Sequence, residues 1–173
     1  MNTFHFRKAE FQDAEDIWTI LQQGIERRKK DGSPQWQQGY PNPDSIKSDI
    51  LKGAGFVLTD HENIAAYCAV ILNDEPAYQT IKGKWLSDGD FYVIHRVAVA
   101  DEYIGKGLAK RIFKEAEEFA RNNSVFSIKV DTNFDNEAML AVLEKLGYQY
   151  CGEVEMRGAA RMAFEKLLEN LIS

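Results

Sequence analysis

The sequence is poor in residues that gather around metal ions. It has two cysteines and three histidines among 173 residues, and Cys68 and Cys151 lie far apart without a Cys-x-x-Cys spacing. A structural zinc site needs several such ligands close together, so we predict no metal site. Both cysteines lie in apolar segments, and we expect them to be buried as small hydrophobic residues. The sequence does not exclude a disulfide between them, but the composition suits a reducing cytoplasm.

Long apolar runs are also missing. No segment is apolar over the length that a membrane-spanning helix needs. Residues 1–5 lack the basic region followed by an apolar region that begins a secretory signal peptide. We therefore expect a cytoplasmic protein without a membrane partner.

Positive charge is in deficit. The chain has 21 lysines and arginines against 27 aspartates and glutamates, a net charge of −6 and a pI of about 5.2. This balance argues against a nucleic-acid partner, because binding to nucleic acid needs a basic face. It is compatible with cationic acceptors such as amines. Hydrophobic residues make up 45% and charged residues 28%, as in soluble globular proteins, and the length predicts a single domain over residues 1–173.

Hydrophobic periodicity and turn residues predict a chain of mixed helices and strands. We expect Asp13, Asp44 and Asp135 to cap helices, and the basic residues 27–30 to be solvated charge at a helix C-terminus. The predicted helices are 13–30, 44–52, 106–122 and 135–146, and the predicted strands are 3–7, 56–59, 64–72, 91–99, 125–130, 148–154 and 161–166, with an insertion at 73–90.

The order of these segments predicts the fold class. The strands cluster, and the segments 91–99, 106–122 and 125–130 form one strand–helix–strand unit, which favours a parallel pair with a right-handed crossover. The last two strands are expected to pair antiparallel. The sequence therefore predicts an α/β (α+β) fold: a mixed, mostly antiparallel central sheet flanked by helices, with one parallel β-α-β crossover at a glycine loop.

That glycine loop is the most informative segment. A β-branched strand ends at Val99, and a Gly-x-Gly-x-Ala sequence at 105–109 leads into an amphipathic helix. Glycines let successive backbone N–H groups face one point, and a helix N-terminus adds unpaired N–H groups and the positive end of its dipole. The segment predicts a phosphate site. The spacing differs from a dinucleotide GxGxxG turn, and Lys106 is followed by Gly107 rather than by the serine or threonine of a P-loop.

Two motifs together resemble the GNAT superfamily of N-acetyltransferases. The run His95-Arg96-Val97-Ala98-Val99 into Tyr103-Ile104-Gly105-Lys106-Gly107-Leu108-Ala109 is similar to the family's Arg/Gln-x-x-Gly-x-Gly/Ala pyrophosphate loop. The run Asn136-Glu137-Ala138 to Glu144-Lys145-Leu146-Gly147-Tyr148 is similar to its Asn-x-x-Ala…Tyr-Glu-Lys-x-Gly-Phe helix. The expected element order β-α-α-β-β-β-α-β-α-β-β also fits this family over nearly the full chain.

The resemblance implies acetyl-CoA as cosubstrate, with CoA as product. The loop from Ile104 would bind the pyrophosphate through backbone N–H groups, the edge of strand 97–99 would pair with the pantetheine amides, and Asn136 would contact the pantetheine arm. Capping the start of a helix is the alternative role of Asn136. Lys106 and Lys110 would add positive charge near the phosphates, and solubility is their alternative role. The residues assigned to acetyl-CoA are Val97, Ala98, Val99, Ile104, Gly105, Lys106, Gly107, Leu108, Ala109, Lys110 and Asn136.

The chain departs from the family pattern at two positions. Ile104 stands where the loop usually opens with arginine or glutamine, so one side-chain contribution is lost while the backbone donors stay. Leu143 stands where the family often has the tyrosine proposed to protonate the leaving thiolate. Tyr103, Tyr148 or water would then have to supply that proton.

Amine attack on a thioester also needs a base, because an alkyl amine is protonated near pH 7. His95 lies in the strand before the loop, where the family often places a carboxylate base, and an imidazole titrates near neutral pH. Strand alternation places His95, Val97 and Val99 on one face, with a backbone N–H near Val97 available to the reacting carbonyl oxygen. The predicted catalytic residues are His95 and Tyr103; a structural strand histidine is the alternative for His95.

Acceptor binding is predicted from aromatic residues. Trp36 and Tyr40 lie between the first two helices, where the resemblance implies an acceptor pocket, and their rings would receive a cation or a flat ring. Covering the core beneath a loop is the alternative. Trp85 is a further aromatic residue that could contribute to the acceptor pocket. The acidic residues Asp88, Asp90 and Glu102 would attract a cationic amine, and solvated surface is their alternative role.

The leading hypothesis is an N-acetyltransferase acting on a primary amine of an unidentified small molecule or peptide. The rival hypothesis is a non-catalytic acyl-CoA-binding sensor or interaction module on the same scaffold, which Leu143 motivates. The resemblance also leaves room for a homodimer.

Overall fold

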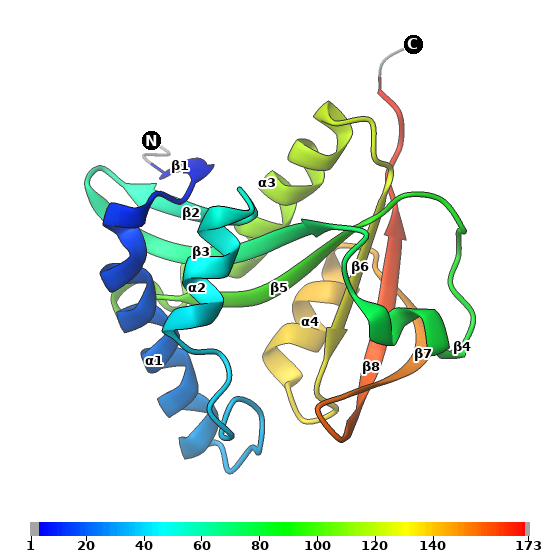
Figure 1. Ribbon diagram of the computed structural model, residues 1–173, viewed down its shortest axis with the longest axis horizontal. Coiled ribbons are helices and arrows are strands. Elements are labelled where there is room, and N and C mark those ends of the chain that lie inside the picture. Colours follow the sequence, from blue (N-terminus) through cyan, green and yellow to red (C-terminus); the bar gives the residue numbers. More distant parts are fainter. Residues whose placement is uncertain (1–3, 172–173) are drawn as a thin grey trace. The chain divides into compact units, whose positions relative to one another are not determined.

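A computed structural model describes residues 4–171, and Figure 1 shows its elements. Within these residues the strand order is β1-β2-β3-β5-β6-β8-β7-β4. β5 and β6 are parallel, whereas the registers of β1 with β2, β2 with β3, β6 with β8, β8 with β7 and β7 with β4 are antiparallel. The predicted fold class, a mixed and mostly antiparallel sheet with helices, is confirmed.

The chain forms two compact units, the first from residues up to 70 together with 95–115, and the second from 71–94 together with 116 onward. β3, β5 and α3 each run from one unit into the other. The elements of the first unit are β1 (Phe4–Lys8), η1 (Phe11–Asp13), α1 (Ala14–Lys30), α2 (Pro43–Leu51), β2 (Gly55–Asp60), β3 (Asn63–Leu72), the end of β5 (Tyr92–Val99), η3 (Asp101–Tyr103) and the start of α3 (Leu108–Asn122).

In the first unit, β2 and β3 form the predicted hairpin, and β1 pairs along the other edge of β2. The helices α1 and α2 pack against each other (Figure 1). Ile17 and Leu21 of α1, Ile46 of α2 and Leu58 of β2 are fully buried. Cys68 is also fully buried and free, as predicted. The apolar faces of two helices and a hairpin thus form this unit's core.

The helix starts of the first unit differ from the prediction. Asn42, and not Asp44, caps α2: its side chain accepts from the Ser45 N–H at 3.0 Å. Pro43 then takes the first helical position, which suits its fixed φ and missing N–H. Asp13 precedes α1 without a side-chain capping bond to it, because its carboxylate accepts from Arg7 and from the Glu10 N–H. The first predicted strand began at Thr3, which lies outside the described residues.

The second unit contains the remaining strands and α4. Its elements besides the shared ones are η2 (Pro76–Thr80), β4 (Lys82–Gly83), β6 (Ser127–Thr132), α4 (Glu137–Lys145), β7 (Gln149–Met156) and β8 (Ala159–Leu167). β8 lies between β6 and β7 (Figure 1), which confirms the predicted closing pair. Tyr92 lies opposite Ile128 in the parallel β5–β6 pair. Cys151 is 8% exposed and free, as predicted.

The segment 73–90 is more ordered than a simple insertion. It contains η2 and β4, and Tyr78 from η2 belongs to a buried cluster with Val93, Val154, Met156 and Ala163. The fully buried carboxylate of Glu165 accepts from the Leu86 N–H and from the hydroxyl of Ser87. A buried carboxylate is tolerated only when donors surround it, so these bonds hold the segment to β8.

Candidate active site

The loop between β5 and α3 has the geometry of an anion site. Gly105 and Gly107 adopt φ values of +83° and +75°. The helix begins at Leu108, two residues after the predicted start, because these left-handed conformations cannot continue a helix. The carbonyl of Gly107 accepts the first helical bond, from the Arg111 N–H at 3.1 Å. The N–H groups of residues 108–110 therefore have no acceptor within their own helix.

The glycines are required by the backbone and not by neighbouring side chains. A Cβ built on Gly105 or Gly107 meets no atom within 4 Å. A left-handed φ costs other residues roughly 1–2 kcal/mol. Ile104 is 51% exposed, and the ammonium of Lys106 lies 5.1 Å from the ring centroid of Tyr103. The loop thus presents backbone donors and a lysine on an open surface, which fits a pyrophosphate group.

The last turns of α1 hold the beginning of this loop. Arg27 donates from Nη2 to the Val99 carbonyl oxygen at 2.8 Å and forms an ion pair with Asp101. Gln23 accepts from the Asp101 N–H at 2.9 Å. The prediction that residues 27–30 are only solvated charge is therefore wrong for Arg27. Hydrophobic periodicity predicts where the helix ends, but it does not predict that the end of strand β5 packs against it.

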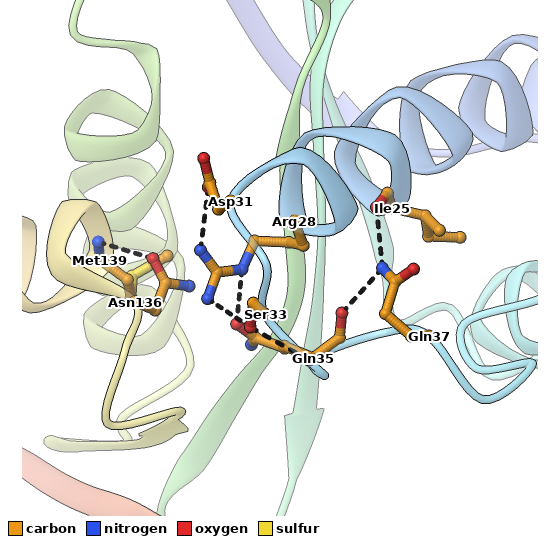
Figure 2. A network of polar contacts seen from close by, with 8 residues as sticks. All are labelled: Ile25, Arg28, Asp31, Ser33, Gln35, Gln37, Asn136 and Met139. Atoms are coloured by element: carbon orange, nitrogen blue, oxygen red, sulfur yellow. Dashed lines mark hydrogen bonds and ion pairs between the residues drawn. The ribbon is translucent and has the colours of Figure 1, made fainter.

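Arg28 organises the loop that follows α1, as Figure 2 shows. Its guanidinium donates to Asp31 at 3.2 Å, to the Ser33 hydroxyl at 2.8 Å and to the Gln35 side chain at 3.1 Å. The solvated-charge prediction is thus wrong for Arg28 as well. The amide of Gln37 donates back to the Ile25 carbonyl at 2.9 Å. The segment before α2 is consequently ordered by polar contacts with α1.

Trp36 packs on α1. It has a left-handed φ of +64° and is half-buried. A Cβ built on Gly24 would lie 3.0 Å from Cζ3 of its ring, so the glycine inside α1 makes room for the indole. Trp36 therefore covers α1 with one part of its surface, as in the packing alternative, while another part stays exposed.

A buried polar network joins Tyr40, Asp49, Tyr67 and Arg96. The guanidinium of Arg96 donates from Nε to Asp49 at 2.9 Å, and its two other nitrogens donate to Asp49 and to the Tyr40 hydroxyl. The Tyr67 hydroxyl donates to the same carboxylate. The Arg96 and Asp49 side chains are 9% and 3% exposed. Burial raises the pKa of Tyr67 above its usual value, and the negative charge of Asp49 raises it further. Burial, the largest single effect, lowers the pKa of Arg96, but the hydrogen bonds and charge of Asp49 together with Tyr40 and Tyr67 outweigh it, and the net direction is upward.

The backbone departs from regular strand geometry beside His95, and we call this position the bend of β5. Arg96 has φ of +54° in the middle of β5, and strand alternation cannot be counted through such a residue. The predicted common face of His95, Val97 and Val99 is therefore interrupted between its first two members. His95 and Val97 are both half-buried at this bend.

Comparisons with known proteins identify the family of this chain. The pattern of the acetyltransferase (GNAT) family matches residues 20–148. The chain belongs to the GNAT family. The uncharacterized N-acetyltransferase YesJ of Bacillus subtilis is 29% identical over 153 residues, which cover 86% of this chain and 83% of YesJ. A solved GNAT-family acetyltransferase from Streptococcus agalactiae is 35% identical, with 96% of each chain covered and a TM-score of 0.89.

A more distant solved structure has the same fold. The structure of yncA from Salmonella typhimurium, solved with its cofactor acetyl-CoA, is 16% identical and covers 99% of this chain and 98% of its own, with a TM-score of 0.67. At this identity the likeness shows the GNAT fold alone. The predicted enzyme class, an acetyl-CoA-dependent acyltransferase, agrees with the family.

Tyr103 lies at the loop, but its hydroxyl proton is engaged. The hydroxyl donates to the Asp60 carboxylate at 3.1 Å, and the ring meets Phe4 edge-on with centroids 5.9 Å apart. Burial raises the pKa of Tyr103, and the bond to Asp60 raises it further. A GNAT enzyme that used this hydroxyl as an acid would have to break that bond.

Most of the remaining predicted residues lie in the second unit. Asn136, and not Asp135, caps α4, and its side chain accepts from the Met139 N–H at 3.2 Å (Figure 2). Leu143 is fully buried. The Tyr148 hydroxyl donates to Glu117 at 3.2 Å, and burial raises its pKa well above the usual value. Trp85 donates to the Tyr78 carbonyl at 2.8 Å. Asp88 and Asp90 are exposed there, as Glu102 is in the first unit.

Sequence reasoning missed Arg27, Asp49 and Arg96 as residues that shape the site. One signal was present: Arg96 interrupts the apolar strand 91–99, and a charge in such a run needs a buried partner. The partner, Asp49, lies 47 positions away and has no local signature. No cluster of three or more potential metal ligands occurs among residues 4–171, and no helix within them is long and apolar enough to cross a membrane.

Proposed function

We propose that the protein is an N-acetyltransferase that moves an acetyl group from acetyl-CoA to a primary amine by direct attack of the amine on the thioester. The observation that carries this proposal is the α3 N-terminus behind the turns at Gly105 and Gly107. Three N–H groups without helical acceptors and the positive end of a helix dipole converge there. When bound, acetyl-CoA supplies an activated acyl group with a thiolate as leaving group.

The chain's own residues would bind the cosubstrate through backbone polarity. Residues 104–110 hold the pyrophosphate, with the ammonium groups of Lys106 and Lys110 adding charge. The edge of β5 at 97–99 pairs with the pantetheine amides. Arg27 supports this edge, because it fixes the Val99 carbonyl from the side of α1. Asn136, whose side-chain oxygen caps α4, is proposed to contact the pantetheine arm.

His95 is proposed as the base that takes a proton from the acceptor ammonium, directly or through water. Its place beside the bend at Arg96 supports this role, because the bend ends regular strand geometry where a substrate must approach. Water is proposed as the proton source for the thiolate, since Tyr103 and Tyr148 both give their protons to carboxylates. A thiolate is a good leaving group, so this loss of acid help does not abolish turnover.

The acceptor is proposed to be a small-molecule or peptide amine that meets the loop of Trp36 and Tyr40. Both aromatic side chains are half-buried, so part of each stays exposed. Their faces attract a cation, and the net charge of −6 favours the approach of one. The cytoplasmic location and the homodimer expected from the sequence stay predictions.

A second candidate is a non-catalytic acyl-CoA-binding module. The fully buried Leu143 favours it, because this side chain provides no proton at the position where the family often has a tyrosine. The two functions share the cofactor loop and differ in turnover alone.

The test begins with calorimetric titration of acetyl-CoA, with CoA and ATP as comparison ligands. We expect micromolar binding of acetyl-CoA and CoA and none of ATP. CoA thiol release is then followed over a broad amine panel. His95→Ala should lower kcat by about 10²–10⁴-fold and leave the acetyl-CoA Kd unchanged. Binding without thiol release for any amine would select the binding module; no binding at millimolar acetyl-CoA would refute both functions.

A further inference from the structure

Arg96 occupies an unfavourable position for its residue type. It lies within a strand at φ +54°, where a side chain with a Cβ costs roughly 1–2 kcal/mol, and its side chain is only 9% exposed. Its chain neighbours are His95, the proposed base, and Val97, the start of the proposed pantetheine edge. Glycine would fit this backbone better. The arginine side chain must therefore contribute something that glycine lacks.

That contribution is a rigid connection to α2. Nε and one terminal nitrogen of Arg96 bind the two carboxylate oxygens of Asp49. A bidentate pair of this kind fixes the guanidinium plane. Asp49 accepts a further bond from Tyr67 of β3, and its side chain is 3% exposed. The anchor is thus buried and contacted from two elements, β5 and β3.

The third guanidinium nitrogen reaches the acceptor loop. It donates to the Tyr40 hydroxyl, and the guanidinium carbon lies 5.8 Å from the Tyr40 ring centroid. Because the Asp49 pair fixes the plane of the guanidinium, it also fixes where Tyr40 is held. One side chain therefore connects the acceptor loop with the bend of β5.

We propose that Arg96, anchored by Asp49, is a positioning residue that sets the acceptor loop through Tyr40 and the bend between His95 and Val97. The proposal rests on the proposed function and adds a specificity determinant to it. Tyr40 would then contact the acceptor from a fixed position, and Arg96 would act on the acceptor only through Tyr40 and His95.

The first test needs no substrate. Amide hydrogen exchange is compared over residues 36–42 in the wild type, Tyr40→Phe, Arg96→Lys and Arg7→Lys. Arg7→Lys is the matched control, because Arg7 of β1 also forms a bidentate pair, here with Asp13, and neither residue belongs to the segment 36–42. We expect exchange in 36–42 to rise about tenfold in Tyr40→Phe and Arg96→Lys, and to stay unchanged in the control. A lysine has one ammonium and cannot replace three guanidinium contacts.

The second test uses turnover. Tyr40→Phe should raise the amine KM about 3–10-fold, as expected for the loss of one hydrogen bond of typical net strength, with the acetyl-CoA Kd unchanged. Arg96→Gly fits the bend but lacks the anchor, so it should raise the amine KM and also lower kcat through His95. Unchanged exchange in Tyr40→Phe and Arg96→Lys, or equal effects on amine KM and acetyl-CoA Kd, would overturn the proposal. Absence of turnover in the wild type would refute the proposed function instead, and the exchange result would still decide whether Arg96 holds the loop.

Discussion

Arg27 of α1 donates to the carbonyl oxygen of Val99, 72 residues later in the chain. The same guanidinium pairs with Asp101 at the first position of η3. These bonds fix the end of β5 at the point from which the glycine loop departs. A helix that contributes no residue to the loop thereby determines where the loop begins.

Replacing Arg27 should therefore weaken cofactor binding. In Arg27→Met the helix keeps an apolar stem but loses both bonds, and the end of β5 is less fixed. We expect the acetyl-CoA Kd to rise about 3–10-fold, measured by calorimetry. Lys30→Met removes the same charge from an exposed position of the same helix end and should leave Kd within a factor of two. Equal effects of the two substitutions would indicate long-range electrostatics instead of positioning.

A side chain at the glycine turn of residues 105–107 should weaken the binding of acetyl-CoA. Gly107→Ala imposes roughly 1–2 kcal/mol of left-handed strain and shifts the first N–H groups of α3. Gly147→Ala is the matched control, because Gly147 has φ of +83° and an equally open surrounding, but follows α4. We expect both variants to lose similar free energy of unfolding in urea, and Gly107→Ala alone to lose about tenfold in acetyl-CoA affinity. A parallel loss of affinity in Gly147→Ala would contradict the pyrophosphate role of the loop.

Gly24 should control the position of the Trp36 ring. An alanine there gains about 1 kcal/mol in helix propensity, but its Cβ would approach Cζ3 of the indole to 3.0 Å. We expect stability to change little, the Trp36 indole N–H resonance to shift, and the amine KM to rise. Gly89→Ala, at an open position without left-handed φ, should leave the Trp36 resonance in place. An unmoved resonance in Gly24→Ala would show that the indole packs elsewhere in solution.

Stability should depend on pH through Asp13. Hydrogen bonds from Arg7 hold the pKa of this carboxyl below its usual range, against the opposing effect of burial. A carboxyl with a depressed folded pKa contributes stability above its unfolded pKa of about 3.9 and loses it as pH falls through the folded value. We expect Asp13→Asn to cost about 1 kcal/mol at pH 7, allowing for solvent screening.

Urea unfolding at a series of pH values measures this difference. The gap between wild type and Asp13→Asn should be constant from pH 5 to 8 and should shrink below pH 4. Asp31→Asn is the control, since the Asp31 side chain is 63% exposed, and it should show no such dependence. A gap that persists at low pH would assign the Asp13 effect to packing.

Local patterns predicted the elements of this fold with errors of a few residues. The end of α4 at Gly147, with φ of +83°, follows from a rule about glycine after helices. The starts of α2 and α3 were misplaced because the prediction favoured Asp44 as a cap and placed Lys106 inside a helix. Pro43 takes the first helical position of α2 with its fixed φ, and the left-handed φ of Gly107 prevents α3 from beginning before Leu108.

The candidate site was predicted in part. The glycine loop, the strand before it and Asn136 follow from two sequence motifs, because their function depends on residues that are adjacent in the chain. The residues that hold them were not predicted. Arg27 was taken for solvated charge, and Arg96 and Asp49 were not singled out, since nothing local distinguishes a buried arginine or aspartate from an exposed one.

The sequence by itself thus determined the secondary structure, the parallel crossover and the glycine turn that we propose to bind phosphate. These features depend on hydrophobic periodicity and on the φ values that glycine allows, and both are properties of neighbouring residues. Only the tertiary structure decided that Arg96 pairs with Asp49 across 47 residues and Arg27 with Val99 across 72. The formation of such bonds depends on which elements the core brings into contact, and no single segment encodes it.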